Sequence, residues 1–402
     1  MSSSFDDIPD RLARLKRRSM YRHRRVVQGP QGRELVVDGQ RLLNFCSNDY
    51  LGLANDERIR RAFKRGVDRW GVGAGASHLV CGHTTAHHEL EESLAEMTGR
   101  PRALFFSSGY AANLGVINAL VGARDCVFED RLNHASLLDG GWISRARFEF
   151  YEHLSVDDLD ARLAESEGGR RLIVSDGVFS MDGDRCPLTD LARLADRHVA
   201  WLMIDDAHGF GVIGERGAGS VDPAHFDTGQ VPVLMATLGK AVGTSGAFVA
   251  GDDSLIEFLI QRSRNYIYTT ALPAAVAEAT RASLEIVCSE NWRREKLSEL
   301  IARFRQGVRE RGIDVMPSDT PIQPVIVGDA DAALGASQAL EARGFLITAI
   351  RPPTVPQGTS RLRITLTAAH TNEDVDRLVS ALDEVLGEVP GGQSGGVDGV
   401  AT

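Results

Sequence analysis

Short apolar runs alternate with amphipathic stretches through the middle of the chain. The stretches from His88 to Met97 and from Leu188 to Arg197 place apolar residues three or four positions apart, which predicts helices with one buried face. The apolar runs are about four residues long and nearly uniform, as expected for strands that are buried on both faces of a largely parallel sheet. These runs are Ala103–Phe106, Leu172–Ser175, Trp201–Ile204, Val233–Ala236 and Ala247–Ala250. Strand and helix in alternation predict a layered α/β domain.

The pattern changes after an apolar helix predicted over residues 274–287. A charged helix from Trp292 to Arg311, extended segments at Pro324–Val327 and Leu362–Leu366, and a last helix from Asn372 to Leu386 predict a smaller α+β domain. Residues 390–402 are Gly-rich and lack apolar periodicity, so we expect a disordered tail. The expected organisation is a basic, partly extended N-terminal arm (1–45), a large α/β domain (46–287), an α+β domain (288–389) and the tail (390–402).

The composition is that of a globular protein, because 43% of the 402 residues are apolar and can fill a sizeable core. No stretch approaches the roughly 18 apolar residues that span a bilayer, and the start, MSSSFDDIPDRLARLKRR, lacks the apolar core of a signal peptide. We therefore expect a cytoplasmic protein with no membrane partner. The five cysteines form no CxxC pair, which predicts neither a disulfide framework nor a structural metal site.

The formal net charge of −10 argues against general nucleic-acid binding. One segment departs from this balance, because residues 11–25 concentrate eight Arg and Lys residues with no acid among them. This segment needs an explanation of its own.

The first candidate site is the segment Phe105–Asn113 (FFSSGYAAN), where an apolar strand meets a small-residue turn that opens an apolar helix. The N-terminus of such a helix leaves backbone N–H groups free to bind an anion. Taken alone, the segment is better explained as an ordinary turn between a strand and a helix.

The second candidate site is Trp201–Gly209 (WLMIDDAHG), which puts Asp205, Asp206 and His208 at the carboxyl end of a predicted buried strand. Ligands of open α/β sheets bind at this edge. A buried carboxylate requires a positive partner, and a protonated pyridine nitrogen is one such partner. A metal site or a pair of helix-capping residues is the alternative.

The third candidate site is Val233–Lys240 (VLMATLGK), a predicted strand followed by a hydroxyl, a glycine and a lysine. A lysine in a partly desolvated, positively biased pocket has a lowered pKa and reacts with carbonyl compounds. A solvated surface lysine is the alternative. The Gly-Lys pair is not a phosphate-binding P-loop, because Ala241 follows where Ser or Thr is required.

Two other patterns fail on their context. The segment Gly71–Ala76 fits a dinucleotide-binding G-x-G-x-x-A pattern, yet it follows a charged helical stretch and not a strand, so we interpret it as a flexible loop. His83, His87 and His88 offer helical H-x-x-x-H spacing, but the residues that follow break the zinc-protease pattern. We interpret these histidines as surface or capping residues.

Six motifs in this order resemble the α-oxoamine synthase family of pyridoxal-phosphate (PLP) enzymes: SSGYAAN, DRLNHASLLDG, SDGVFSMDGD, IDDAHGFGVIGE, ATLGKAVG and YIYTTALP. The resemblance covers roughly residues 22–385. It implies an α/β fold of PLP fold type I, like aspartate aminotransferase, with a mostly parallel seven-stranded sheet and a smaller C-terminal α+β domain. It also implies a homodimer with its active site at the subunit interface, PLP as the cofactor and no metal.

The resemblance assigns five residues to the reactive part of the cofactor. Lys240 holds PLP covalently, His134 stacks on the pyridine face and Asp205 pairs with the ring nitrogen. His208 and Ser180 lie near the phenolate oxygen of the ring. Of these, Lys240, His134, Asp205 and His208 are the implied catalytic residues.

The resemblance assigns a second group to the cofactor phosphate. These residues are Gly109 and Tyr110 through their backbone, Thr237, and Thr269 or Thr270 from a partner subunit.

The resemblance assigns four residues to the substrates: Arg351, Asn48, Arg22 and His134. Arg351 takes the amino-acid carboxylate, which the planar fork of a guanidinium fits at two oxygens. Asn48 is another substrate-side position, and Arg22 lies towards the acyl substrate. The loop from Gly73 to His83 departs from the family pattern at Ala76, His78 and Cys81, which affects contacts with the acyl donor and not the PLP chemistry.

The segments 348–356 and 361–370 are similar to the branch of the family that condenses L-alanine with pimeloyl-CoA or a pimeloyl carrier protein in biotin synthesis. Members that use glycine or serine are the alternatives: 2-amino-3-ketobutyrate CoA ligase, 5-aminolevulinate synthase and serine palmitoyltransferase. A PLP lyase of the threonine-aldolase kind and a catalytically silent binding subunit are alternatives from other classes. The sequence does not choose between the CoA and the carrier-protein donor.

Two hypotheses account for the basic segment 11–25. In the first, it lies near the donor entrance and attracts the phosphates of CoA or the acidic face of a carrier protein. In the second, it is a solvated amphipathic helix whose Leu12 and Leu15 dock on the domain.

Overall fold

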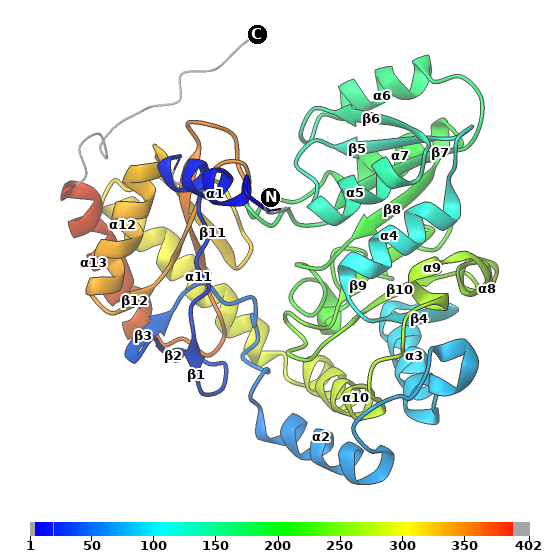
Figure 1. Ribbon diagram of the computed structural model, residues 1–402, viewed down its shortest axis with the longest axis horizontal. Helices are drawn as coiled ribbons and strands as arrows, with labels where there is room; N and C mark the ends of the chain where they lie inside the picture. The colour runs from blue at the N-terminus through cyan, green and yellow to red at the C-terminus, as the bar shows by residue number, and fades with distance from the viewer. Residues whose placement is uncertain (1–4, 19, 389–402) are drawn as a thin grey trace. The chain divides into compact units, whose positions relative to one another are not determined.

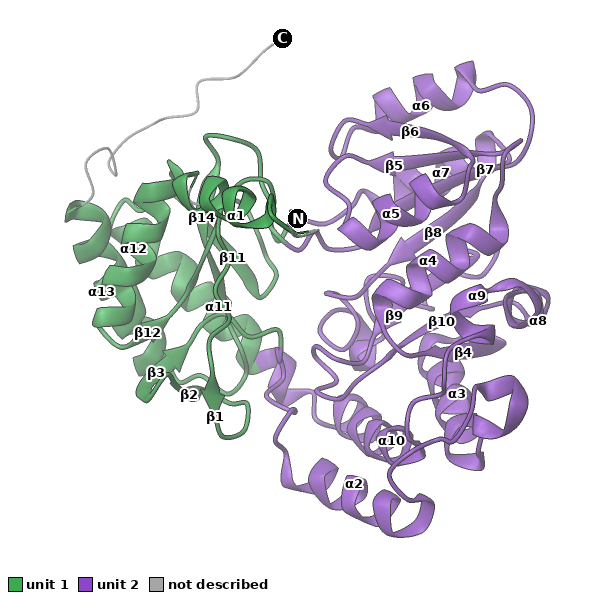
Figure 2. Cartoon of the chain, in the orientation of Figure 1, with its two compact units in different colours: residues 1–48, 181–183, 296–402 green, residues 49–180, 184–295 purple. Residues whose placement is uncertain are grey.

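The structure is a computed structural model that describes residues 5–18 and 20–388 in two units (Figure 2). Unit 1 comprises residues 1–48, 181–183 and 296–402, and unit 2 comprises residues 49–180 and 184–295. The tail over 390–402, for which we expect disorder, lies outside the described residues. Among the described residues, no helix combines the length and the apolar composition that a membrane crossing requires.

Unit 2 is built on a seven-stranded sheet in the order β4-β10-β9-β8-β7-β5-β6 (Figure 1). Its strands are β4 (Arg102–Phe106), β5 (Cys126–Asp130), β6 (Arg147–Tyr151), β7 (Arg171–Asp176), β8 (Trp201–Asp205), β9 (Val233–Thr237) and β10 (Ala247–Gly251). Strand β10 runs antiparallel to both of its neighbours, and the remaining pairs are parallel. The predicted fold class, with a mostly parallel seven-stranded sheet, is confirmed.

Helices cover both faces of this sheet, because successive residues of each buried strand point to opposite sides. The helices of unit 2 are α2 (Glu57–Trp70), α3 (Thr85–Thr98), α4 (Gly109–Leu120), α5 (Ala135–Ile143), α6 (Val156–Glu165), α7 (Leu188–Arg197), α8 (Asp253–Arg262), α9 (Arg264–Ile267) and α10 (Ala274–Ser289). On one face Leu172, Val174 and Met203 pack with α4, α5, α8 and α9. On the other face Ile173 and Leu202 pack with α6 and α7, and the neighbouring strands pack with α3 and α10.

Unit 1 contains two smaller sheets and their helices. One sheet has the order β1-β2-β3-β12 and the other β11-β14-β13. The strands are β1 (Val27–Gln28), β2 (Glu34–Val37), β3 (Gln40–Asn44), β11 (Ile322–Gly328), β12 (Phe345–Leu346), β13 (Thr348–Ile350) and β14 (Ser360–Thr365). The helices are α1 (Ile8–Arg17), α12 (Ala330–Ala342), α13 (Asn372–Glu388) and most of α11 (Trp292–Glu310).

The basic segment forms helix α1 and an extended stretch after it. The side chains of Leu12 and Leu15 are 41% and 38% exposed, and no residue of α1 is buried. The predicted helix is confirmed, and its two leucines are partly covered without being buried.

Candidate active site

The candidate residues gather where parallel strands of unit 2 end. Asp176 is the last residue of β7 and Asp205 the last residue of β8, and the sheet register pairs them directly. Strand β9 pairs with β8 through Met235 opposite Asp205, and the chain then reaches Lys240 three residues after the end of β9. Parallel strands present their carboxyl ends at one edge, so three predicted segments meet there.

Asp205 is a buried carboxylate, only 3% exposed, that is held by two N–H donors. Its Oδ1 accepts a hydrogen bond from the backbone N–H of Ala207 at 3.0 Å, and its Oδ2 accepts one from Nδ2 of Asn113 at 2.7 Å. Burial, and then the neighbouring charge of Asp205, raise the pKa of Asp176 well above its usual range. The raised pKa keeps Asp176 neutral, so Asp176 does not add a second negative charge beside the carboxylate of Asp205, which can pair with a cation at this position.

Lys240, His208 and Tyr50 form a chain of hydrogen-bonding groups. The Nζ of Lys240 lies 2.8 Å from Nε2 of His208, and the Nδ1 of His208 lies 2.6 Å from the hydroxyl of Tyr50. A lysine ammonium only donates, so Nε2 of His208 accepts and Nδ1 carries the proton that is donated to Tyr50. Tyr50 is fully buried and fixes the plane of the imidazole, which in turn positions the amine of Lys240.

His134 caps the N-terminus of α5 and keeps a neutral ring. Its Nδ1 accepts hydrogen bonds from the hydroxyl of Ser136 at 2.7 Å and from the backbone N–H of Ser136 at 3.3 Å. Its own backbone N–H donates to Asp176 at 2.6 Å. Burial lowers the pKa of His134. The proton of the neutral ring is therefore on Nε2.

Asn113 connects the two halves of the site. Its Nδ2 donates to Oδ2 of Asp205 and also to the hydroxyl of Ser136 at 2.9 Å, and that hydroxyl is left to donate to His134. Asn113 and Ser136 are buried at 0% and 1% exposure, so neither exchanges these partners for water. The carboxylate and the imidazole are thereby oriented through one continuous network.

A helix N-terminus lies at the same edge. Ser108 caps α4 by accepting a hydrogen bond from the N–H of Ala111 at 3.1 Å, and α4 begins at Gly109. The first N–H groups of a helix have no acceptor within the helix and favour an anion. A side chain at Gly109 would meet only Met235, at 3.7 Å, so the glycine leaves space beside these N–H groups. Thr237 is half-buried, with its hydroxyl donating to the carbonyl of Gly246 at 3.0 Å.

These residues fit PLP, the cofactor that the sequence resemblance implies. The cofactor offers a basic ring nitrogen to a buried carboxylate, a carbonyl carbon to an amine, a flat ring face to an imidazole and a phosphate to a helix N-terminus. Asp205, Lys240 and His134, together with the start of α4, supply these four groups within unit 2.

The other residues assigned by the resemblance belong to further segments of the two units. Ser180 is half-buried and is the last residue of the range 49–180 of unit 2. Thr269 and Thr270 are exposed in the segment after α9. Three substrate-side residues belong to unit 1. Arg22 is exposed in the stretch after α1, Arg351 directly follows β13, and the Oδ1 of Asn48 accepts hydrogen bonds from Arg363 at 3.2 and 3.3 Å.

Sequence reasoning missed Asn113, Ser136, Tyr50 and Asp176 as parts of the site. Asp176 carried a usable signal, since it ends a predicted buried strand next to the strand of Asp205. The other three come from helices and a loop whose contacts depend on tertiary structure.

The chain matches the family model of aminotransferase class I and II over residues 40–382. The 8-amino-7-oxononanoate synthase of Nitrosococcus oceani is 61% identical over 93% of this chain and 100% of its own length. Eight curated relatives with that name are 55–61% identical over 91–96% of this chain.

Solved structures agree with these relatives. A serine palmitoyltransferase from Sphingomonas wittichii has a TM-score of 0.90 at 31% identity and covers 96% of this chain and 99% of its own. An SPT structure with PLP has a TM-score of 0.90 at 30% identity, with coverage of 96% and 98%. The crystal structure of 8-amino-7-oxononanoate synthase from Francisella tularensis has a TM-score of 0.75 at 29% identity, covering 85% of this chain and 97% of its own.

Proposed function

Because this chain belongs to the aminotransferase class I and II family and, within it, to the 8-amino-7-oxononanoate synthases, we propose how its own residues carry out that reaction. The reaction joins L-alanine to a pimeloyl thioester and gives 8-amino-7-oxononanoate, CO2 and a free thiol. The α-carbon of alanine forms a bond to the thioester carbonyl carbon, the bond from that carbon to sulfur breaks, and the alanine carboxylate leaves as CO2. The residue assignment rests on one observation: Asp205, His208 and Lys240 meet at one edge of the sheet.

PLP, when bound, supplies a protonated pyridine ring that accepts the electron pair released at the α-carbon of alanine. Asp205, whose carboxylate is oriented by hydrogen bonds from Asn113 and Ala207, would pair with the ring nitrogen and keep it protonated. A neutral asparagine could not do so. His134 would pack against the ring, where its neutral state would avoid a second positive charge beside the pyridinium.

Lys240 anchors the cofactor and then acts as the general base. Its Nζ would take the α-proton of alanine, and the imidazole of His208, 2.8 Å from that nitrogen, would keep the amine in place. Tyr50 holds His208 from behind, so the amine has one preferred orientation. By the family resemblance, Ser180 and His208 would lie near the phenolate oxygen of the cofactor.

The phosphate is held by the backbone of Gly109 and Tyr110 at the start of α4 and by Thr237. The free N–H groups and the space beside Gly109 support this assignment. Arg351 binds the carboxylate of alanine, Asn48 lies on the substrate side and Arg22 lies towards the acyl donor, each by family resemblance.

We also propose that the active unit is a homodimer in which Thr269 or Thr270 completes the phosphate site of the partner. The exposure of both threonines in unit 2 supports this, since exposed hydroxyls are available to another subunit. Lys240→Ala protein and Thr269→Ala/Thr270→Ala protein, each weakly active alone, should complement one another after subunit exchange. Random reassortment leaves one intact site in half of the dimers, or about a quarter of the wild-type activity. Activity that stays at the sum of the two variants would contradict shared sites.

Product mass spectrometry tests the function directly. The PLP-loaded protein is incubated with pimeloyl-CoA and an equimolar mixture of alanine, glycine and serine, and a parallel reaction contains a pimeloyl carrier protein. The expected product is 8-amino-7-oxononanoate, with one thiol released per product, and the two reactions rank the donors. A product whose mass shows that glycine or serine was used would assign the chain to another branch of the family.

A further inference from the structure

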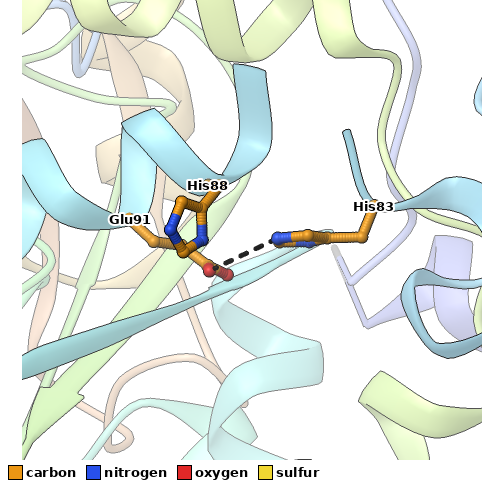
Figure 3. Close-up of side chains that lie close together, drawn as sticks. All are labelled: His83, His88 and Glu91. Carbon is orange, nitrogen blue, oxygen red and sulfur yellow. Dashed lines mark ion pairs between the residues drawn. The ribbon is translucent and has the colours of Figure 1, made fainter. Parts of the chain in front are cut away.

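A second cluster of ligating side chains lies in unit 2, on the side of α3 (Figure 3). His83 follows a single π-helical turn (His78–Gly82), whereas His88 and Glu91 are three residues apart on α3 and share one face. One ligand atom from each of the three residues lies within 4.8 Å of the others. The Nε2 of His83 is 3.9 Å from Oε2 of Glu91. The three side chains line a cavity of about 280 Å³.

Strand β4, beside α3, orients the carboxyl group of Glu91. Its Oε1 accepts a hydrogen bond from the backbone N–H of Phe105 at 2.9 Å, and its Oε2 is turned towards His83. The carboxyl side chain is 14% exposed, so it is oriented by protein and not by bulk water. An anchored carboxylate with one oxygen directed at an imidazole is the arrangement of a ligand with an outer-shell partner.

His83 is oriented by a second histidine. Its Nδ1 lies 2.9 Å from Nδ1 of His78, and two such nitrogens at this distance share one proton. When that proton is on His83, its Nε2 lone pair faces Glu91 and is available to a metal. His78 then acts as the outer-shell acceptor that selects this tautomer.

We propose that His83, His88 and Glu91 bind a divalent cation of the zinc class. Two imidazoles and one carboxylate form a donor set that suits Zn²⁺, and three protein ligands leave a fourth position open to the cavity. Bonds of about 2.0–2.2 Å place tetrahedral ligand atoms about 3.3–3.5 Å apart, so the present spacing closes by about 1.5 Å at most. His88 supplies the movement, because its side chain is 65% exposed and its ion pair with Glu92, at 3.4 Å, is itself exposed and weak.

The charges around the cavity permit a cation. Glu91 and Glu92 line it, and Arg102 is the positive group nearby. Arg102 is drawn towards α8, where it lies 3.4 Å from Glu257 and 3.9 Å from Asp253. Its charge is therefore partly compensated outside the cluster.

The cation would fasten the segment before α3 to α3 itself. That segment includes His78, which stacks on Tyr266 at 4.9 Å, and it follows Ser77, which forms a β-bridge with Thr270. The cluster thus lies beside the loop in which this chain departs from the family pattern. Binding of the cation fixes this loop and, through the bridge, the threonine segment.

Calorimetric titration of Zn²⁺ into untagged, PLP-loaded protein after chelator treatment tests the site, with Co²⁺ absorption as a second probe. We expect one ion per chain. His88→Gln should fold normally, because His88 is on an exposed helix face. It should bind Zn²⁺ at least about 10- to 100-fold more weakly, since that is the loss caused by removing even an outer-shell partner. His83→Gln should behave alike, and Zn²⁺ should raise the melting temperature of wild type but not of these two histidine variants.

His225→Gln and Cys81→Ser are the matched controls, because both residues are exposed and neither belongs to the cluster. Both should bind Zn²⁺ as wild type does, with the spectrum of bound PLP unchanged. Absence of stoichiometric binding to wild type would overturn the proposal. Binding that survives His88→Gln and His83→Gln, or that is lost in Cys81→Ser or Lys240→Ala, would place the ion elsewhere and overturn it equally.

Discussion

Replacing Asn113 by alanine separates the carboxylate of Asp205 from the network that orients it. Asn113 is fully buried, and its Nδ2 donates at 2.7 Å to Asp205 and at 2.9 Å to Ser136. Alanine removes both hydrogen bonds while favouring the helical conformation of α4. The variant therefore tests the network without disturbing the helix that carries it.

The size of the effect follows from the charge of the acceptor. A hydrogen bond to a charged group contributes about 1.5–3 kcal/mol, and Asp205 retains only the donor Ala207 N–H at 3.0 Å. If the whole of this contribution acts in the transition state, kcat falls by about 10- to 150-fold. The fall is smaller if a water molecule enters the space and replaces the amide.

The assay combines three measurements on the PLP-loaded protein. Steady-state kinetics with alanine and pimeloyl-CoA give kcat, the visible spectrum as a function of pH reports the protonation of bound PLP, and urea unfolding gives stability. We expect Asn113→Ala to lower kcat and to displace the spectral pH profile, whereas a purely structural role would lower stability alone.

Asn118→Ala is the matched control. Asn118 is on the same helix, and its Nδ2 donates to the carbonyls of Leu114 at 2.8 Å and Gly140 at 3.3 Å, without contact to Asp205. The same chemical change there should reduce stability and leave the spectral profile unchanged. Equal losses of kcat in the two variants, or a spectral profile for Asn113→Ala like that of wild type, would refute the reasoning.

Three further changes give distinct outcomes. Arg351→Lys should raise the KM for alanine about 10-fold, because an ammonium cannot make the two-point carboxylate contact, and an unchanged KM would move that contact elsewhere. Burial raises the pKa of Glu129 to about 8, so this residue is neutral in the folded protein and ionised in the unfolded chain between about pH 4.3 and 8. Stability should therefore fall with rising pH across this window, by up to about 1.4 kcal/mol per unit from this residue, and urea unfolding of Glu129→Gln should lack that component. Raising the ionic strength, which shortens the Debye length from about 30 Å at 0.01 M to about 8 Å at 0.15 M, should lower kcat/KM for the acyl donor and not for alanine. Replacing Arg14, Arg17 and Arg18 by Glu should flatten that salt dependence, and equal slopes would leave α1 without a steering role.

Much of the α/β core was predictable because burial on both faces leaves an apolar run. The runs around Leu172, Trp201 and Val233 became β7, β8 and β9 with no bound shifted by more than one residue. Strands β5 and β6 were not identified. Strand β5 carries the buried acids Glu129 and Asp130, and the edge strand β6 is largely half-exposed, so neither reads as a uniform apolar run.

The direction of β10 was not predictable from its residues. Ala247–Gly251 is buried throughout, and the parallel strands β7 and β8 are also mostly buried. Strand β10 nevertheless pairs antiparallel with β4 and β9. An apolar run indicates that both faces of a strand are covered. It does not indicate the direction of the strand, which depends on the segment that connects it to its neighbours. The apolar runs and the family resemblance both implied a mostly parallel sheet, and neither indicated that β10 is the antiparallel strand.

Candidate residues at strand ends were predictable for a similar reason. Asp205 and Lys240 follow apolar runs, and parallel strands bring such ends to one edge. The residues that orient them do not follow from local sequence. Asn113 is one turn inside α4, Ser136 is in the first turn of α5, and they meet only because the two helices pack on the same face of the sheet.

The histidines before and within α3 show why spacing alone assigns the wrong partners. H-x-x-x-H spacing joins His83 to His87, which presumes that both are on one helix, but α3 begins at Thr85. His87 is confirmed as a capping residue. Its Nδ1 accepts a hydrogen bond from the N–H of Thr84 at 3.1 Å and its Nε2 donates to the carbonyl of Leu272 at 2.7 Å, so neither nitrogen is left for a metal. His88, one residue later, is turned by about 100° around the helix and faces the same side as Glu91. A ligand set is therefore defined by the nitrogens that the fold leaves accessible to an ion, here Nε2 of His83, which faces Glu91, and the exposed imidazole of His88.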